Sequence, residues 1–418
     1  MIDLLESEHS LWSGHVPPAE VDFLNKVATF ATNEVAPHAS AWEEAEALPR
    51  KIFTAAGRIG LMGVTTPVAL GGQGFGYVTY ALAIRAIAKH QGALALDLAA
   101  HNALAVGHIL AAGGAAQHRH VFPRLANGDW LGAWALTEPE AGSDSGGVQT
   151  VATEKSDGSW ELNGFKRFIT SGSTAEVLVV MAASGTTEKG RKEISAFLVE
   201  KSQIQPQRKI PTCGLRASDT SEFKLVQARG ELLGARGSGQ VVALGCLDKG
   251  RIGVAAVSLG LARAALDAAL NHAVRRTQFG KRLADFQALQ FMLADCDTEI
   301  QAAELLVLQA AILATKGVKH AKESSIAKLF ASEAASRICN RSLQIHGGYG
   351  YTRDVPIERF WRDARLSEIG EGSSEVQRIV ISRALLKPAF DRLGWSPLSV
   401  RTIRKPRRAR TPSVVSRK

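Results

Sequence analysis

Hydrophobic positions recur every three or four residues in two separate parts of the chain, a spacing typical of helices with one buried face. The first part carries such stripes over residues 24–35, 82–88 and 98–110, and the first stripe ends before Pro37. The second part carries them over residues 259–274, 286–314, 323–344 and 375–386. The pattern therefore predicts helices at both ends of the chain.

The middle third has a different pattern, with short apolar runs separated by polar turns. Asp157 and Gly158 form a typical hairpin turn between two of these runs. Strands are predicted over residues 148–154, 160–163, 177–181, 194–199 and 223–226. The order is thus helical, β, helical, and we predict a helical domain over 1–130, a β domain over 131–238, a helical bundle over 239–388 and a tail over 389–418.

Composition narrows the class of protein. The 418 residues are 45% hydrophobic and 22% charged, which is typical of a globular protein. The longest apolar run, residues 252–262, is shorter than the ~20 residues that cross a bilayer. Near the N-terminus the sequence has acidic residues where an export signal would have basic residues followed by apolar ones. We therefore expect a cytoplasmic protein without a membrane span. Its four single cysteines are expected to be buried free thiols, and no residue spacing indicates a metal site: Cys213, Cys246, Cys296 and Cys339.

The net charge of +10 is concentrated at the C-terminus. Residues 391–418 contain nine basic side chains and one acidic side chain, which leaves the rest of the chain at only +2. A nearly neutral body with a basic tail containing Pro and Ser is typical of a folded enzyme with a disordered extension. Binding of nucleic acid is therefore not the favoured function.

Residues 134–147, at the junction between the helical and β parts, read WALTEPEAGSDSGG. Small and hydroxyl residues leave backbone N–H groups free to face a polar ligand, and Thr137 and Ser143 add side-chain hydroxyls. Taken alone, the segment could also be an ordinary turn.

Two further segments near the C-terminus combine glycines with polar side chains. Residues 344–354 read QIHGGYGYTRD, and paired glycines after a helix permit close approach of a ligand to the backbone. Residues 369–377 read IGEGSSEVQ and place Glu371 between two glycines just before a helix. Glycines on both sides would let a substrate reach this carboxylate, although a solvated loop glutamate is the simpler alternative.

In this order, the three segments resemble the acyl-CoA dehydrogenase family, and the resemblance covers about residues 15–387. It implies a mainly α fold with an N-terminal helical domain, a β-barrel-like middle domain and a C-terminal four-helix bundle, assembled as a homotetramer. It also implies a flavoprotein oxidoreductase of fatty acid or amino acid degradation. Such an enzyme uses FAD to convert an acyl-CoA thioester to the 2,3-enoyl-CoA and passes electrons to an electron-transfer flavoprotein. An acyl-CoA oxidase and a DNA-associated flavoprotein of the same fold stay open as alternatives.

The resemblance also implies residue roles. Glu371 would be the catalytic base, with a pKa raised by burial, whereas Gly250, where some members carry the base, cannot take a proton. The substrate would contact Ser143, Asp248, Arg251 and Gly372. FAD would contact Trp134, Leu136, Thr137, Gly142, Ser143, Phe168, Ile169, Thr170, Arg276, Phe279, Gln287, Gln344, Gly347, Gly348, Ser373, Ser374 and Glu375.

Two finer expectations concern the assembly and the substrate. Arg276 and Gln344 are expected to bind FAD across a subunit boundary. Gly370 stands where many straight-chain members have Tyr, so the acyl pocket should have room near the reacting carbons. This predicts a short, branched or cyclic acyl group, unless another side chain fills the space.

Overall fold

The computed structural model describes residues 12–188 and 190–392. Its first part is helical, as the periodicity predicts, and a π-helical segment at Ala100–Val106 joins two of the helices. The helices that contact the C-terminal bundle are apolar on nearly every face, because they are covered on more than one side. The helices are α1 (Pro18–Phe30), α2 (Ala39–Glu44), α3 (Arg50–Arg58), α4 (Tyr77–Ala88), α5 (Gly92–Ala99), α6 (Gly107–Ala112) and α7 (Ala115–Ala126).

The middle part is a sheet whose strand pairing closes on itself. The strands are β1 (Gly132–Ala135), β2 (Val151–Glu154), β3 (Trp160–Thr170), β4 (Val177–Thr186), β5 (Lys192–Glu200), β6 (Ile204–Lys209) and β7 (Thr220–Leu233). Neighbours follow the order β4, β2, β3, β7 and β5, and β5 pairs back with β4. β1 adds to β4 and β6 adds to β7, so the sheet is barrel-like, as expected.

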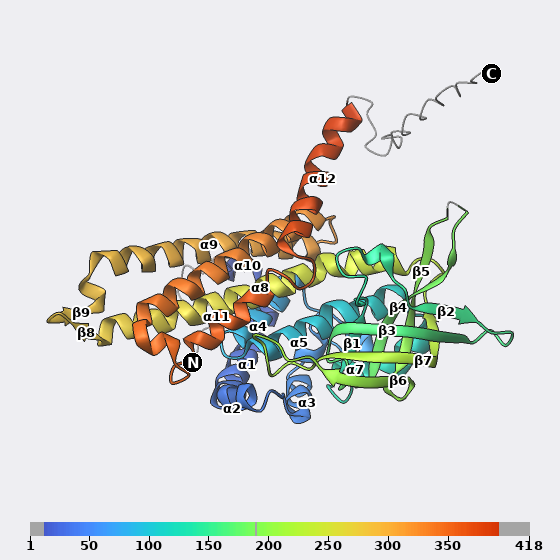
Figure 1. The fold of residues 1–418 in the computed structure, drawn as a ribbon, viewed down its shortest axis with the longest axis horizontal. Helices are drawn as coiled ribbons and strands as arrows, with labels where there is room; N and C mark the ends of the chain where they lie inside the picture. Colours follow the sequence, from blue (N-terminus) through green and yellow to red (C-terminus); the bar gives the residue numbers. More distant parts are fainter. Residues whose placement is uncertain (1–11, 189, 393–418) are drawn as a thin grey trace, which may run out of the picture.

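The C-terminal part packs three long helices against one another, and its first helix also contacts α4 and α5 (Figure 1). The helices are α8 (Gly239–Arg275), α9 (Gln287–Thr315), α10 (Ala321–His346), α11 (Ile357–Leu366) and α12 (Ser374–Arg392). A two-stranded hairpin, β8 (Thr277–Gln278) and β9 (Lys281–Arg282), lies at the end of the molecule away from the central sheet (Figure 1). The predicted order of helical, β and helical parts is confirmed.

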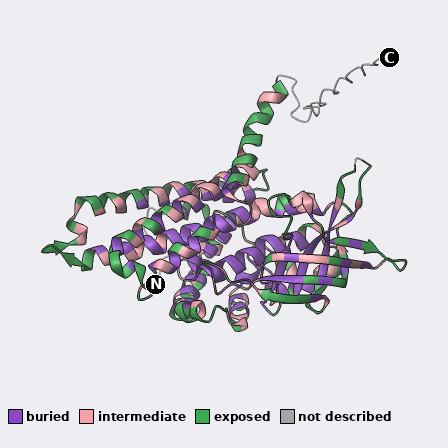
Figure 2. Ribbon diagram, in the orientation of Figure 1, coloured by how far each residue is buried: buried purple, intermediate pink, exposed green. Residues whose placement is uncertain are grey.

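The last helix, α12, projects from the body of the molecule (Figure 1). Most of its length is exposed, and its buried residues, Ser374 and Gln377, lie in the first turn (Figure 2). It continues to Arg392, four residues into the tail predicted over 389–418. The remainder of the predicted basic tail, residues 393–418, lies outside the described residues.

Cys213 is exposed, so the prediction that all four cysteines are buried was wrong for this residue, while the other three are buried.

By length and composition, three helical stretches of the described chain could cross a membrane, although burial accounts for the apolarity of the first two. They are Gly92–Ala112 (83% buried), Gly239–Arg275 (83%) and Gln287–Thr315 (44%). The absence of a membrane span, argued from the longest apolar run, stays a prediction.

Candidate active site

Glu371 lies in the turn between α11 and α12, in a backbone conformation that non-glycine residues rarely adopt. Its φ is +53° and that of Gly372 is +93°, so two consecutive residues are left-handed. The carboxylate Oε2 is buried and has no hydrogen-bond partner in the described structure. A Cβ placed on Gly250 would lie 2.1 Å from this oxygen, so the carboxylate lies against α8 at a point where only glycine leaves room.

The surroundings of Glu371 bring its titration close to neutral pH. Burial raises the pKa of this carboxyl to about 7, against the opposing effect of the Lys328 and Arg251 charges. A carboxylate of this basicity is suited to accept a proton from a weak carbon acid.

Two of the predicted substrate residues form an ion pair beside this carboxylate. Arg251 Nη1 donates to Asp248 Oδ1 at 2.7 Å and to Ser325 Oγ at 3.2 Å. Arg251 Nε is buried without a partner in the described structure, and burial lowers the pKa of this guanidinium. The fold therefore brings Asp248 and Arg251 to the neighbourhood of Glu371 and Gly372. Ser143, the fourth predicted substrate residue, lies in the exposed segment after β1.

The predicted flavin segments after β1 and along β3 lie side by side. Arg167 N donates to Thr137 O at 3.0 Å across them. The pairing of β3 with β7 shifts register between Lys166 and Ile169, and within this bulge Phe168 has a φ of +57° and is 55% exposed. Ile169 is buried beside it. An outward-facing aromatic ring at a bulge is suited to contact a flat ligand.

The remaining residues of these two segments differ in exposure. Leu136 is buried, Thr170 is half-buried, and Gly142 and Ser143 are exposed. Trp134 Nε1 donates to His108 Nδ1 at 3.3 Å.

Trp134 connects these segments to Glu371. Its side chain packs on a small apolar cluster that includes Leu104 and Cys246. Leu104 also borders Gly250, because a Cβ there would lie 2.9 Å from Leu104 Cδ2. The start of the predicted flavin segment and the predicted base therefore share one wall.

A buried ion pair beneath the flavin segment was not predicted from the sequence. Lys166 Nζ donates to Glu138 Oε1 at 2.6 Å, to Leu136 O at 3.2 Å and to Met181 O at 2.7 Å. Glu138 also accepts hydrogen bonds from Thr150, and both partners of the ion pair are buried. The signal that could have revealed this ion pair is Lys166 itself, which stands on a strand two residues before Phe168. A lysine on a strand is more often exposed, so this position was not considered for a buried ion pair.

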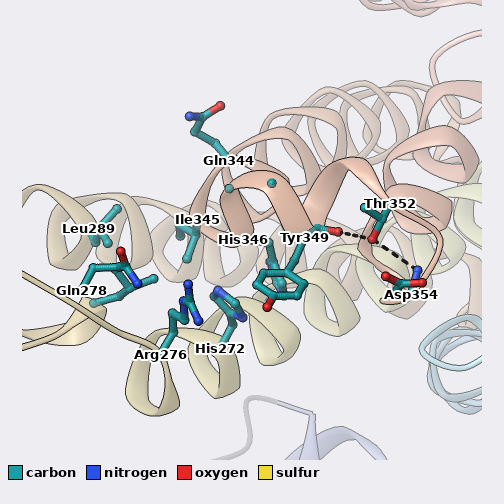
Figure 3. A pocket seen from close by; sticks show the side chains of 13 residues that line it. His272, Arg276, Gln278, Leu289, Gln344, Ile345, His346, Tyr349, Thr352 and Asp354 are labelled. Carbon is teal, nitrogen blue, oxygen red and sulfur yellow. Dashed lines mark hydrogen bonds between the residues drawn. The ribbon is translucent and has the colours of Figure 1, made fainter.

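Four predicted flavin residues line a surface pocket of about 570 Å³ at the end of α8 and α10: Arg276, Gln344, Gly347 and Gly348 (Figure 3). Sequence reasoning missed His272 and Tyr349, which line it too. The ring of His272 stacks on that of His346 at 4.5 Å, and the Arg276 guanidinium lies 5.5 Å from the Tyr349 ring. A guanidinium beside a glycine turn is suited to hold a phosphate group.

The other predicted flavin residues are dispersed. Phe279 is 92% exposed in the β8–β9 turn, and Gln287 is exposed at the start of α9. Ser374, in the first turn of α12, has a buried hydroxyl without a partner among residues 12–188 and 190–392. It lies next to the half-buried Ser373 and the exposed Glu375.

The pocket of Arg276 and the carboxylate of Glu371 do not form one site within this chain. Arg251, beside Glu371, and Arg275, beside the pocket, are both on α8, and their 24-residue separation corresponds to about 36 Å at ~1.5 Å per residue. A single FAD molecule does not span both places in one chain. The pocket could serve the flavin of Glu371 only if a second copy supplied it.

Comparison with known proteins identifies the family. The sequence matches the family models "Acyl-CoA dehydrogenase, N-terminal domain" over residues 17–129, "middle domain" over 133–228 and "C-terminal domain" over 237–386. The chain therefore belongs to the acyl-CoA dehydrogenase family, whose members are FAD-dependent oxidoreductases acting on CH–CH donors.

Individual relatives agree with this assignment. An acyl-CoA dehydrogenase of Bacillus subtilis is 41% identical over 89% of this chain and 99% of its own length. The solved structure of butyryl-CoA dehydrogenase from Megasphaera elsdenii has a TM-score of 0.86 and 36% identity, covering 89% of this chain and 99% of that one. A chain in a structural study of the electron transferring flavoprotein of Acidaminococcus fermentans has the same TM-score and coverages at 37% identity.

Proposed function

We propose that this protein oxidises an acyl-CoA thioester to the 2,3-enoyl-CoA, with Glu371 as the base that removes the α-proton. The observation that carries the proposal is the Glu371 carboxyl, whose pKa is raised to about 7 and whose buried Oε2 lies against Gly250 without a hydrogen-bond partner among the described residues. The α-proton passes to Glu371 Oε2 while the double bond forms between the α and β carbons. Bound FAD supplies the acceptor for the hydride that leaves the β-carbon.

The described residues fit a flavin in two separate regions. The exposed Phe168 ring and the segment after β1 would contact the ring system near Glu371. The pocket of Arg276 and Gln344 would hold the phosphates of a flavin bound mainly by a neighbouring subunit. The distance along α8 supports this division and, with the family resemblance, a homotetramer.

A substitution at Glu371 tests the proposed reaction. In Glu371→Gln, the amide keeps the shape of the side chain but cannot accept the proton, so flavin reduction by substrate should slow by at least about 10³-fold. FAD and CoA-ester binding should be retained. Reduction by this variant at the wild-type rate would show that Glu371 is not the base.

For the substrate, we propose a short, branched or cyclic acyl group. A Cβ placed on Gly370 would meet Leu366 at 3.6 Å, which is an ordinary contact. The backbone therefore has room for a side chain at this position, and the glycine leaves that room free. Similarity to a butyryl-CoA dehydrogenase supports a short chain.

Restoring bulk at this position tests the proposed substrate class. Gly370→Tyr should reduce kcat/KM for a branched acyl-CoA more than for butyryl-CoA, because a ring would crowd substituents at the reacting carbons. Equal losses for both substrates, or a wild-type preference for palmitoyl-CoA, would argue against this role of Gly370.

For the electron acceptor, we propose an electron-transfer flavoprotein, since a structural neighbour comes from a study of such a protein. Reduced enzyme should then reoxidise slowly in air and quickly with that partner. Fast reoxidation by oxygen alone would favour the acyl-CoA oxidase alternative. The cytoplasmic location stays a proposal from the sequence.

A further inference from the structure

The turn that carries Glu371 needs support from its surroundings. A left-handed conformation is unfavourable for a residue with a side chain, and it persists only where neighbouring groups hold it. At Glu371 this conformation continues directly into the left-handed Gly372. The orientation of the carboxylate therefore depends on what holds these two peptide groups.

Two buried side chains hold the carbonyl of Gly372. Lys328 Nζ and Gln377 Nε2 each donate to Gly372 O at 2.7 Å, and Gln377 Nε2 also donates to Glu371 O at 3.3 Å. Both side chains belong to fully buried residues. Lys328 is on α10 and Gln377 is in the first turn of α12, so this carbonyl clamp joins two helices at the turn.

Lys328 brings a charge as well as a hydrogen bond. Removing an ammonium from water is costly, and burial lowers the pKa of Lys328 to about 8. The nearby carboxylate of Glu371 opposes this effect, as do those of Glu368 and Glu333. The ammonium in turn favours the ionised form of Glu371, an effect that it shares with Arg251.

We propose that Lys328 and Gln377 are positioning residues for the reaction, which hold the Gly372 carbonyl so that the Glu371 carboxylate lies against Gly250. The charge of Lys328 has the second task of favouring the ionised form of that carboxylate. The inference rests on the proposed role of Glu371 as the base. Neither residue touches the reacting atoms through its own side chain.

The two tasks can be separated by two variants of the full-length holoenzyme. Lys328→Met removes both the clamp bond and the charge, whereas Gln377→Met removes clamp bonds only. Lys322→Met, on the same helix α10, is the matched control because it removes a lysine that is absent from the clamp. The measurement is the rate constant of flavin reduction by butyryl-CoA as a function of pH.

Both clamp variants should reduce flavin at least about 10-fold more slowly at saturating substrate, because small displacements of a catalytic group are costly. In Lys328→Met, the half-maximal rate should also move upward by about 1 pH unit, since an opposite charge near a carboxylate lowers its pKa by that order. The other charges near the carboxylate are unchanged in this variant. Arg251 on α8 still faces it, and so does the buried hydroxyl of Tyr80 on α4. Gln377→Met and Lys322→Met should keep the wild-type midpoint.

Several outcomes would overturn the inference. Wild-type rates in both clamp variants would reject the clamp, and an unchanged midpoint in Lys328→Met would reject the role of its charge. If Lys328→Met does not fold, Lys328→Gln is used in its place, because it keeps a donor but removes the charge. The same upward shift of the midpoint is expected for it. Full activity in Glu371→Gln would instead reject the proposed base, whereas an inactive Glu371→Gln with a normal Lys328→Met rejects only this inference.

Discussion

The chemistry proposed for Glu371 depends on the lack of a hydrogen-bond donor at its buried Oε2 in the described structure. Its Oε2 lacks a hydrogen-bond partner in the described structure, and burial therefore disfavours the ionised form more than the nearby Lys328 and Arg251 charges favour it. An isolated glutamate in solution would be ionised but too weak a base. The same side chain in this turn is about half ionised near neutral pH and correspondingly more basic.

This balance predicts the pH dependence of the reaction. Since the pKa of Glu371 is raised to about 7, the carboxyl is protonated at lower pH and cannot accept the substrate proton. The apparent second-order rate constant of flavin reduction should rise with pH, with a midpoint near 7, and then level off. Rapid mixing at limiting substrate measures it for the free enzyme. A rate that does not change between about pH 5 and pH 9 would contradict the assignment.

A second prediction concerns the buried pair of Lys166 and Glu138. Removing one partner leaves the other charge buried and unpaired, which costs about 3–5 kcal/mol. Lys166→Met should therefore lower the melting temperature and loosen flavin binding at the segment that this lysine holds through Leu136 O. The double variant Lys166→Met/Glu138→Gln should recover part of the loss. A double variant less stable than Lys166→Met would show that the unpaired charge is not the cause.

At the scale of elements, periodicity predicted the long helices α9 and α10 well, whereas the stripe at 259–274 marked only the second half of α8, which begins at Gly239. α9 was predicted over 286–314 and occupies Gln287–Thr315, because its apolar face repeats over many turns. β1 and β6 were missed. β1 has only four residues, and β6 is mostly exposed at the side of β7, so neither has a long apolar run.

Prediction of the site had a similar limit. Sequence signatures selected the segments around Trp134, Gln344 and Glu371, but not the buried lysines beneath them. Lys328 lies on the buried face of α10 with Ala331 and Ala335, where a hydrophobic residue is usual. Its role depends on a carbonyl 44 residues away in sequence, which no local pattern contains.

Helix α8 closely approaches the turn of Glu371 at Gly250. Gly250→Ala would place a methyl group 2.1 Å from the present position of Glu371 Oε2, so the carboxylate must move. Flavin reduction should fall by about 10–100-fold while the protein stays folded.

Gly245 on the same helix provides the control. It is exposed, and a Cβ there would meet nothing within 4 Å. Gly245→Ala should keep the wild-type rate and add about 0.5–1 kcal/mol of stability, because alanine is the better helix former. Equal rates for Gly250→Ala and Gly245→Ala would contradict the close packing at Gly250.

For the whole molecule, the decisive feature is the separation of Glu371 from the Arg276 pocket. If the pocket serves a neighbouring subunit, each site combines Glu371 of one chain with Arg276 of another. Symmetry then makes the exchange reciprocal, so both chains of a pair contribute equally to both sites.

Mixed assemblies test this arrangement. Arg276→Ala alone should lose flavin and Glu371→Gln alone should lose activity. In a mixed pair, both defects fall in one site and the other site is intact, so random co-assembly should restore about a quarter of wild-type activity. Activity in the mixture that equals only the sum of the separate variants would place Arg276 and Glu371 in the same chain's site.

The continuous helix α8 also sets an angular relation between the two sites. An α-helix turns about 100° per residue, so one residue inserted between Arg251 and His272 would rotate the Arg276 pocket by that angle relative to the turn of Glu371. Insertion of seven residues would nearly restore the direction but lengthen the helix by about 10 Å. Neither change leaves both ends aligned with a second copy. The number of residues in this part of α8 should therefore be the same in every relative that shares a site between two copies.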